Sequence, residues 1–204
     1  MIKKTILLEF FMIKDYIRTL LLTLLVPIIL AYLNKSITLS TCIYSIVVSY
    51  RLVSIPFELC EPTADLYSIL PVSKRNLVLG RYIYLMLLGT ILISISIFCE
   101  AVVLYFAGIS QSISLIVFAF IIGFVLFGFM ASIQIPFIYK CGIIKAKTTV
   151  SSIAIIIGVA LIGILTKMDI DMYNVFTIAT LLVICFVFFL LSFMLSLYFY
   201  QAEN

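Results

Sequence analysis

The charged side chains best placed to do chemistry gather in residues 57–82. This stretch holds three acids and three bases, which are Glu58, Glu61, Asp65, Lys74, Arg75 and Arg81. A short apolar segment with acids before it and bases after it suits binding by a soluble protein. An ordinary surface loop would have the same composition, so the pattern alone leaves both interpretations open.

Two helices joined by a proline corner must position these side chains. The pair Pro62-Thr63 is typical of a helix start, and residues 64–70 then give about two turns. The apolar face of this helix consists of Leu66, Tyr67 and Leu70. Pro71 stops the helix. Ser73 can accept from the backbone amides of a second helix that begins with Lys74 and continues into the next membrane span.

Glu100 is the only acid in a predicted membrane span. Counted from Tyr82, it lies roughly 27 Å along its helix, near the outer end of a hydrocarbon core about 30 Å thick. In one interpretation it faces a cavity or a partner subunit and acts on a cationic or amphipathic substrate. In the other, its carboxylate simply reaches the outer headgroups.

Several functional classes are excluded by what the chain lacks. It has no His and no Trp, which removes His-dependent proteases, haem ligation by His and most metal sites. Residues 158–163 begin and end with Gly, but Ile164 and Leu165 follow where a P-loop requires Lys and Ser or Thr. The five cysteines show no metal-like spacing. We therefore expect no catalytic residue, cofactor or metal on this chain, and no nucleic-acid binding.

The composition predicts an all-α integral membrane protein, with residues 1–204 forming a single transmembrane domain. It is 65% hydrophobic and 11% charged, where soluble domains have roughly 25% charged residues. At about 20 residues per span, six transmembrane helices are predicted, at 19–33, 37–57, 82–106, 114–138, 148–165 and 175–200. An interfacial helix over residues 1–18 precedes them. A short cytoplasmic coupling helix lies between spans two and three, within residues 57–81.

Local features refine the spans. Pro27 should kink the first span, Pro56 should end the second, and Gly142 should terminate the helix of the fourth. Arg51 can reach the interface or pair with an acid of the next segment. Small residues of the fourth span, spaced to suit an internal helix contact or a dimer seam, are Ala119, Gly123, Gly128 and Ser132.

Basic residues predict the orientation of the chain. With both termini in the cytoplasm, only Lys35 and Lys167 of the 13 Lys and Arg residues lie outside. Cytoplasmic loops carry the excess of Lys and Arg in membrane proteins. The chain is therefore predicted to be a multi-pass protein of the cell membrane, with residues 57–81 facing the cytoplasm.

Two inner segments resemble a known family. The run YSILPVSKRNLVLGRY at residues 67–82 resembles the LPVS(R/K)(K/R)EIV-hydrophobic-x-(K/R)Y signature of ABC-2 type permeases, the small six-span subunits of ATP-driven exporters. The run PFIYKCGIIKAK at residues 136–147 resembles that family's second inner loop, PxxY(K/R)FGxxKA. Asn76 replaces the usual Glu, which makes the reciprocal capping box less complete. Cys141 replaces the usual aromatic residue.

This resemblance implies partners and site residues. Two permeases, identical or homologous, would pair with two cytosolic ATPase chains, and ATP and Mg²⁺ would be bound by those chains. The residues that dock on the ATPase would be Glu61, Asp65, Leu66, Tyr67, Leu70, Pro71, Ser73, Lys74 and Arg75. The second inner loop would contribute Tyr139, Lys140, Gly142 and Lys145. Closure of the ATPases would then move spans two and three.

The cargo is expected to be amphipathic. The chain resembles in particular the peptide-toxin exporters of Gram-positive bacteria, such as those for phenol-soluble modulins. A mostly aliphatic and aromatic interior suits an amphipathic peptide or lipid-like molecule better than a sugar or an ion. Glu100 is the candidate residue on the substrate path.

Two other classes of function are consistent with parts of the pattern. A membrane-embedded vitamin-binding subunit of an ATP-driven importer is also six-span, and it would bind a small vitamin tightly when purified alone. An intramembrane enzyme would need clustered Asp, His or Ser groups at one depth, and Glu100 is the only acid available there.

Overall fold

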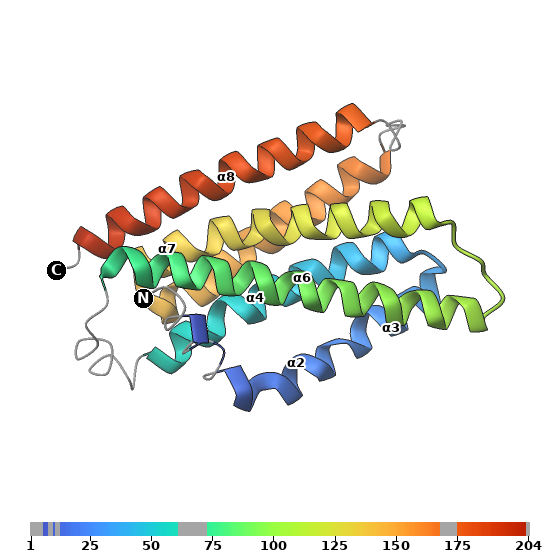
Figure 1. Ribbon diagram of the computed structural model, residues 1–204, viewed down its shortest axis with the longest axis horizontal. Coiled ribbons are helices and arrows are strands. Elements are labelled where there is room, and N and C mark those ends of the chain that lie inside the picture. Colours follow the sequence, from blue (N-terminus) through green and yellow to red (C-terminus); the bar gives the residue numbers. More distant parts are fainter. Residues whose placement is uncertain (1–5, 8–9, 11–12, 61–72, 168–174, 203–204) are drawn as a thin grey trace.

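Long helices make up the described part of the chain, and they lie roughly along one axis (Figure 1). The computed structural model describes residues 6–7, 10, 13–60, 73–167 and 175–202. In chain order the elements are η1 (Ile13–Tyr16), α2 (Ile17–Thr23), α3 (Leu25–Asn34), α4 (Ile37–Cys60), α6 (Lys74–Phe106), α7 (Ile113–Lys167) and α8 (Val175–Ala202). The predicted docking helix at 64–70 falls outside the described residues.

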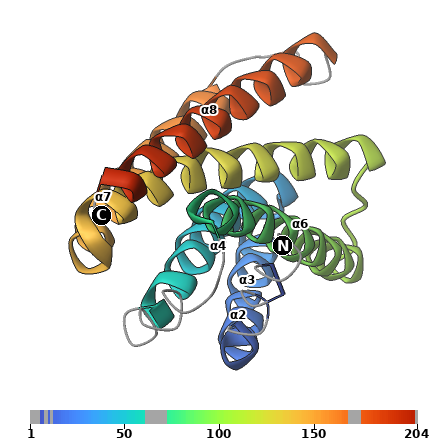
Figure 2. The same cartoon turned by 60° about the vertical axis from the view of Figure 1, so that its left-hand side comes forward.

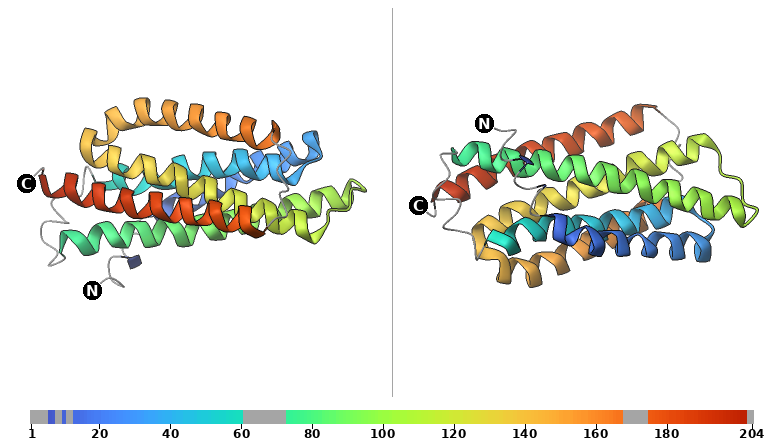
Figure 3. Two further views of the ribbon diagram at one scale, coloured as in Figure 1. Left: turned by 90° about the horizontal axis from the view of Figure 1, so that it is seen from above. Right: turned by 60° about the horizontal axis from the view of Figure 1, so that its bottom comes forward.

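The all-α membrane architecture is confirmed. Helical stretches long and apolar enough to cross a membrane are Ile17–Asn34, Ile37–Phe57, Arg75–Phe106, Ile113–Gly142 and Ile178–Tyr200. The predicted span at 148–165 is helical as the second part of α7, and Figure 3 shows this part running back beside the first. Its crossing of a membrane stays a prediction, and so does the count of six spans.

The bundle has two ends that differ in what they carry. At one end α3 is joined to α4 and α6 to α7; we call this the Lys35 end (Figure 1). At the other end α4 finishes, α6 begins, α7 reverses and α8 finishes; we call this the Gly142 end. The predicted docking segment connects α4 to α6 at the Gly142 end.

Pro27 breaks the first span as predicted. A proline inside a helix has no N–H to donate, and its ring clashes with the carbonyl four residues earlier. That carbonyl belongs to Thr23, where α2 ends, and α3 starts at Leu25. Between them, the Leu24 N–H donates to the Leu21 carbonyl at 3.1 Å, which closes a tighter turn.

The apolar stretch Ile37–Phe57 has the bounds predicted for the second span, but the helix does not end at Pro56. Helix α4 continues through Pro56 to Cys60. Proline costs about 3 kcal/mol in a helix interior, and packing offsets this cost here. The side chains of Ile55 and Phe57, on either side of the proline, are only 5% and 6% exposed and belong to the main hydrophobic core.

The interfacial helix predicted over residues 1–18 stays a prediction, because residues 1–5, 8–9 and 11–12 lie outside the described part of the chain. Ile13–Tyr16 forms a 3₁₀-helix. Ile13 is 2% exposed, and the ring of Phe10 packs edge-on against Tyr84 with centroids 5.4 Å apart. An amphipathic pattern does not distinguish lipid from protein as the apolar partner, and here the partner is the bundle.

Helix α4 is the central element, and it packs most extensively against α7. Small residues allow this approach: a Cβ added at Gly123 would lie 2.8 Å from Thr41 Cγ2. A Cβ at Gly128 would lie 2.9 Å from Cys185 Sγ of α8, which lies alongside α7 and away from α2 and α3 (Figure 2). The small residues of the fourth span therefore serve contacts within the chain.

Candidate functional site

The start of α6 flanks the predicted docking segment and folds as expected. Ser73 has an extended backbone, and its Oγ accepts from the Asn76 backbone N–H at 3.4 Å, so the helix begins at Lys74. Arg75 is exposed beside it. The other predicted docking residues lie outside the described part of the chain and are Glu61, Asp65, Leu66, Tyr67, Leu70 and Pro71.

A buried arginine joins three helices just inside this boundary. Arg81 of α6 is 5% exposed, and its Nη1 donates to the hydroxyl of Tyr139, on α7, at 2.9 Å. Its guanidinium carbon lies 4.3 Å from the ring centroid of Phe57, on α4, and 5.7 Å from that of Tyr139. Both distances are within the range of cation–π attraction. We call Phe57, Arg81 and Tyr139 the Arg81 junction.

The second inner loop extends the Arg81 junction to α8. The rings of Tyr139 and Tyr200 lie 5.3 Å apart, and the Lys140 ammonium lies 5.4 Å from the Phe199 ring. Gly142 has φ 72° and ψ 167°, a conformation essentially restricted to glycine, and it interrupts the helix as predicted; the chain reverses there. Lys140 and Lys145 are exposed on either side of it.

The role of Arg81 in this junction was not predicted from the sequence, which placed it only among the cytoplasmic bases. Charged residues near the end of a span usually extend into the interface. The aromatic partners of Arg81 are far away in sequence, and nothing local points to them. One available signal was that the two family-like runs contain Arg81 and Tyr139, so that a contact between the runs would join these side chains.

Glu100 forms a second buried polar cluster, toward the Lys35 end. Its side chain is 0% exposed. The hydroxyls of Ser40 and Thr41, on α4, donate to Oε2, the latter at 3.1 Å, and that of Ser96 donates to Oε1 at 2.6 Å. We call these four residues the Glu100 cluster. It satisfies a carboxyl group inside a membrane bundle with hydroxyl donors alone among the residues described.

The expectation that Glu100 reaches the outer headgroups is wrong, because neighbouring helices cover it completely. The position of Glu100 along its helix gives its depth in the membrane. It does not show whether the side chain faces lipid or a neighbouring helix. The sequence did contain a signal. Ser96 and Glu100 are four residues apart, as are Ser36 and Ser40, so each pair lies on one helical face and the two faces can meet.

The described part of the chain contains no group of three His, Cys, Asp or Glu side chains that could hold a metal ion. Its two buried charged side chains each sit among partners that hold them in place. Arg81 is held by aromatic rings and a phenol, and Glu100 by three hydroxyls. Such an arrangement ties helices to one another.

Comparisons with known proteins give one match. Residues 4–201 match the model of the family described as ABC-2 family transporter protein. Neither the curated proteins nor the solved structures contain a match to this chain. The family match covers nearly the whole sequence and agrees with an all-helical membrane bundle. The chain therefore belongs to the ABC-2 transporter family, as a membrane-spanning permease subunit and not as the catalytic subunit.

Proposed function

We propose that this permease works in an exporter, with a second permease copy or homologue and two cytosolic ATPase chains that bind ATP and Mg²⁺. Family membership across residues 4–201 is the observation that carries the proposal. The signature-like run at residues 67–82 supports the export direction, because it resembles the run of exporter permeases. We also propose that both termini face the cytoplasm and that the host is a Gram-positive bacterium.

The Arg81 junction supports residues 57–81 as the ATPase-docking segment. Phe57, near the end of α4, is the first residue of this segment, and Arg81, in α6, is its last. Both contact Tyr139, three residues before the reversal at Gly142. A displacement of the docking segment would reach α4, α6 and α7 through the same buried contacts. The second inner loop would follow the first as one rigid body.

An amphipathic peptide is the cargo that the composition favours. The buried polar groups of α4 are hydroxyls, and several of them are bonded to their own helix; Ser45 and Ser49 donate to backbone carbonyls three or four residues earlier. A sugar or an ion would require free polar groups that converge. Glu100 is completely covered, so cargo could reach its carboxyl group only when α4 and α6 separate.

Docking can be tested by placing a charge on the apolar face of the segment at 64–70. Leu66→Asp, Tyr67→Asp and Leu70→Asp should each abolish co-purification with the ATPase, because a carboxylate in an apolar groove is desolvated without a partner. Leu66→Met is the matched control and should leave the complex intact. Membrane insertion of each variant is checked by fractionation. If the complex survives all three Asp substitutions, the docking assignment is wrong.

The orientation can be tested with the chain's own cysteines. Cys141 is exposed at the Gly142 end, while Cys42 and Cys185 are buried in the bundle and serve as internal controls. An impermeant thiol reagent should label Cys141, and also Cys60, in inside-out vesicles and not in intact cells. Labelling of Cys141 from outside intact cells would reverse the proposed orientation.

A further inference from the structure

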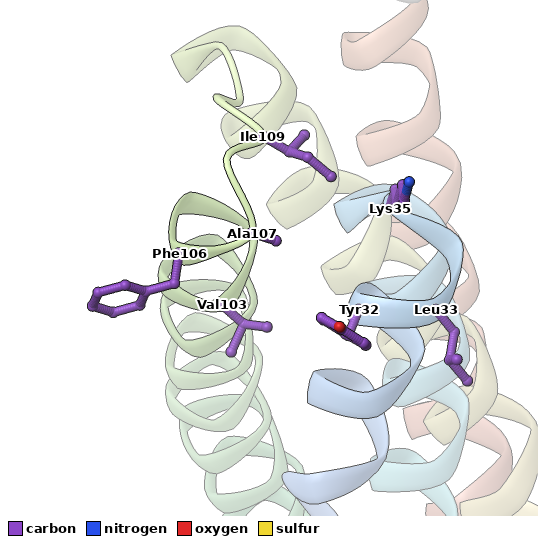
Figure 4. A pocket seen from close by; sticks show the side chains of 7 residues that line it. All are labelled: Tyr32, Leu33, Lys35, Val103, Phe106, Ala107 and Ile109. Carbon is purple, nitrogen blue, oxygen red and sulfur yellow. The ribbon is translucent and has the colours of Figure 1, made fainter.

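A pocket of about 750 Å³ lies at the Lys35 end, between α3 and α6. Figure 4 shows that Tyr32 projects from α3 into the space between the two helices and that Val103 projects from α6 toward it. Ala107 and Ile109, from the turn after α6, continue the wall. The volume is within the range of pockets that bind small organic molecules.

The mouth of this pocket faces the surroundings of the bundle. Tyr32 and Phe106 are 63% and 83% exposed, and Phe106 points away from the pocket in Figure 4. These exposed aromatic residues lie at the ends of the apolar surfaces of α3 and α6. Tyrosines such as Tyr32 are enriched where a membrane protein meets the headgroups. A molecule can therefore enter from the lipid without crossing the bundle.

One cation stands at the rim. Lys35 ends α3 in a left-handed conformation, with φ 53°, and its side chain is exposed. Glu100 is the only carboxylate whose side chain the structure describes, and hydroxyls from α4 and α6 surround it. Within the described residues, the Lys35 ammonium thus has no carboxylate partner.

We propose that this pocket binds one anionic phospholipid, with the phosphate on Lys35 and an acyl chain along Val103, Ala107 and Ile109. The rim supplies the charge that an anionic headgroup requires, and the walls supply an apolar surface for the chain. An extended peptide fits less well, because its backbone N–H and C=O groups would face these apolar walls without partners. The site goes beyond the proposed export function and does not need the ATPase.

The absence of tryptophan makes a direct test possible. Phe106→Trp places the only tryptophan beside the pocket, at a position exposed enough to accept the larger ring. The full chain is reconstituted in phosphatidylcholine vesicles that contain increasing mole fractions of a lipid brominated on its acyl chains. Brominated phosphatidylglycerol should quench this tryptophan at about one fifth of the mole fraction that brominated phosphatidylcholine requires, the preference expected from one lysine.

Matched variants distinguish binding of anionic lipid in the pocket from a general attraction of anionic lipid to the whole protein. In the Phe106→Trp background, Lys35→Gln should remove the preference and Lys35→Arg should keep it. Tyr198→Trp, on α8 at the other end of the bundle and 67% exposed, should show no preference. Equal quenching by the two lipids at Phe106→Trp overturns the proposal, as does a preference that persists in Lys35→Gln or that appears equally at Tyr198→Trp.

A final arm tests a peptide as the occupant. Addition of a soluble amphipathic peptide should leave the anionic-lipid quenching of Phe106→Trp unchanged. Reversal of the quenching by the peptide, with loss of this effect in Lys35→Gln, would assign the pocket to peptide cargo and overturn the assignment to lipid.

Discussion

The chain buries a basic side chain at one end of the bundle and an acidic one toward the other, and it satisfies them differently. Arg81 lies among aromatic faces and donates to a phenol, whereas Glu100 accepts from three hydroxyls. Aromatic rings attract a guanidinium with little directional demand. Hydroxyl donors require defined hydrogen-bond geometry. The cation–π contacts of the Arg81 junction therefore tolerate small helix shifts better than the hydrogen bonds of the Glu100 cluster do.

The two sites also differ in how many helices they join. The Arg81 junction connects α4, α6 and α7, and the tilted ring contact of Tyr139 with Tyr200 extends it to α8. The Glu100 cluster connects only α4 and α6. We infer that buried polar contacts join four helices at the Gly142 end but only one helix pair toward the Lys35 end, where apolar packing of α3, α4, α6 and α7 does the rest. Burial of a charge does not by itself indicate function, but the elements that hold it show what must move together.

The largest effect should come from Arg81→Ala. It removes a cation–π contact worth about 2 kcal/mol and a charged hydrogen bond of about 2 kcal/mol, so the free energy of unfolding should fall by about 4 kcal/mol. Unfolding in detergent can be followed with a thiol-reactive dye, because Cys42 and Cys185 are only 6% and 5% exposed in the folded chain.

The matched variant is Arg81→Lys, which keeps the charge and loses the planar guanidinium. Its loss of stability should be about half that of Arg81→Ala. If Arg81→Ala unfolds at the temperature of the unsubstituted chain, the Arg81 junction does not hold the helices together, and the contrast with the Glu100 cluster disappears.

Gly142→Ala should have an intermediate effect that comes from the backbone alone. No atom lies within 4 Å of an added Cβ, so there is no clash, but φ 72° strains any L-residue. The expected cost is about 2 kcal/mol, measured by the same dye assay. Gly128→Ala is the complementary control. Its backbone is helical and is not strained by a side chain, but its Cβ would meet Cys185 Sγ at 2.9 Å. An unchanged Gly142→Ala would show that the reversal can relax without a glycine.

The smallest effect on stability should come from Glu100→Gln. The amide keeps the shape of the carboxyl group and one acceptor oxygen, and its NH₂ can donate to a neighbouring hydroxyl, so a loss of about 1 kcal/mol is expected. Complex formation with the ATPase should be unchanged, while ATP hydrolysis stimulated by an amphipathic peptide should fall. Unchanged stimulation would leave Glu100 a purely structural link between α4 and α6.

Sequence predicted the elements whose signals are local. The start of α6 at Lys74 follows from Ser73, the break near Pro27 from a missing N–H, and the reversal from Gly142. It failed where packing between distant segments decides. Helix α4 passes through Pro56 because its neighbours are buried. Arg81 and Glu100 are both more buried than their positions along single helices imply, because their partners come from helices whose relative rotation no local pattern fixes.

The break before α3 affects the pocket at the Lys35 end. Since Pro27 cannot donate to Thr23, no backbone hydrogen bond from that residue ties the upper half of the first crossing to the lower half. Tyr32 is carried by the upper half, whereas Val103 belongs to the continuous helix α6. The width of the pocket therefore depends on a helix that follows a break, α3, and on a continuous helix, α6.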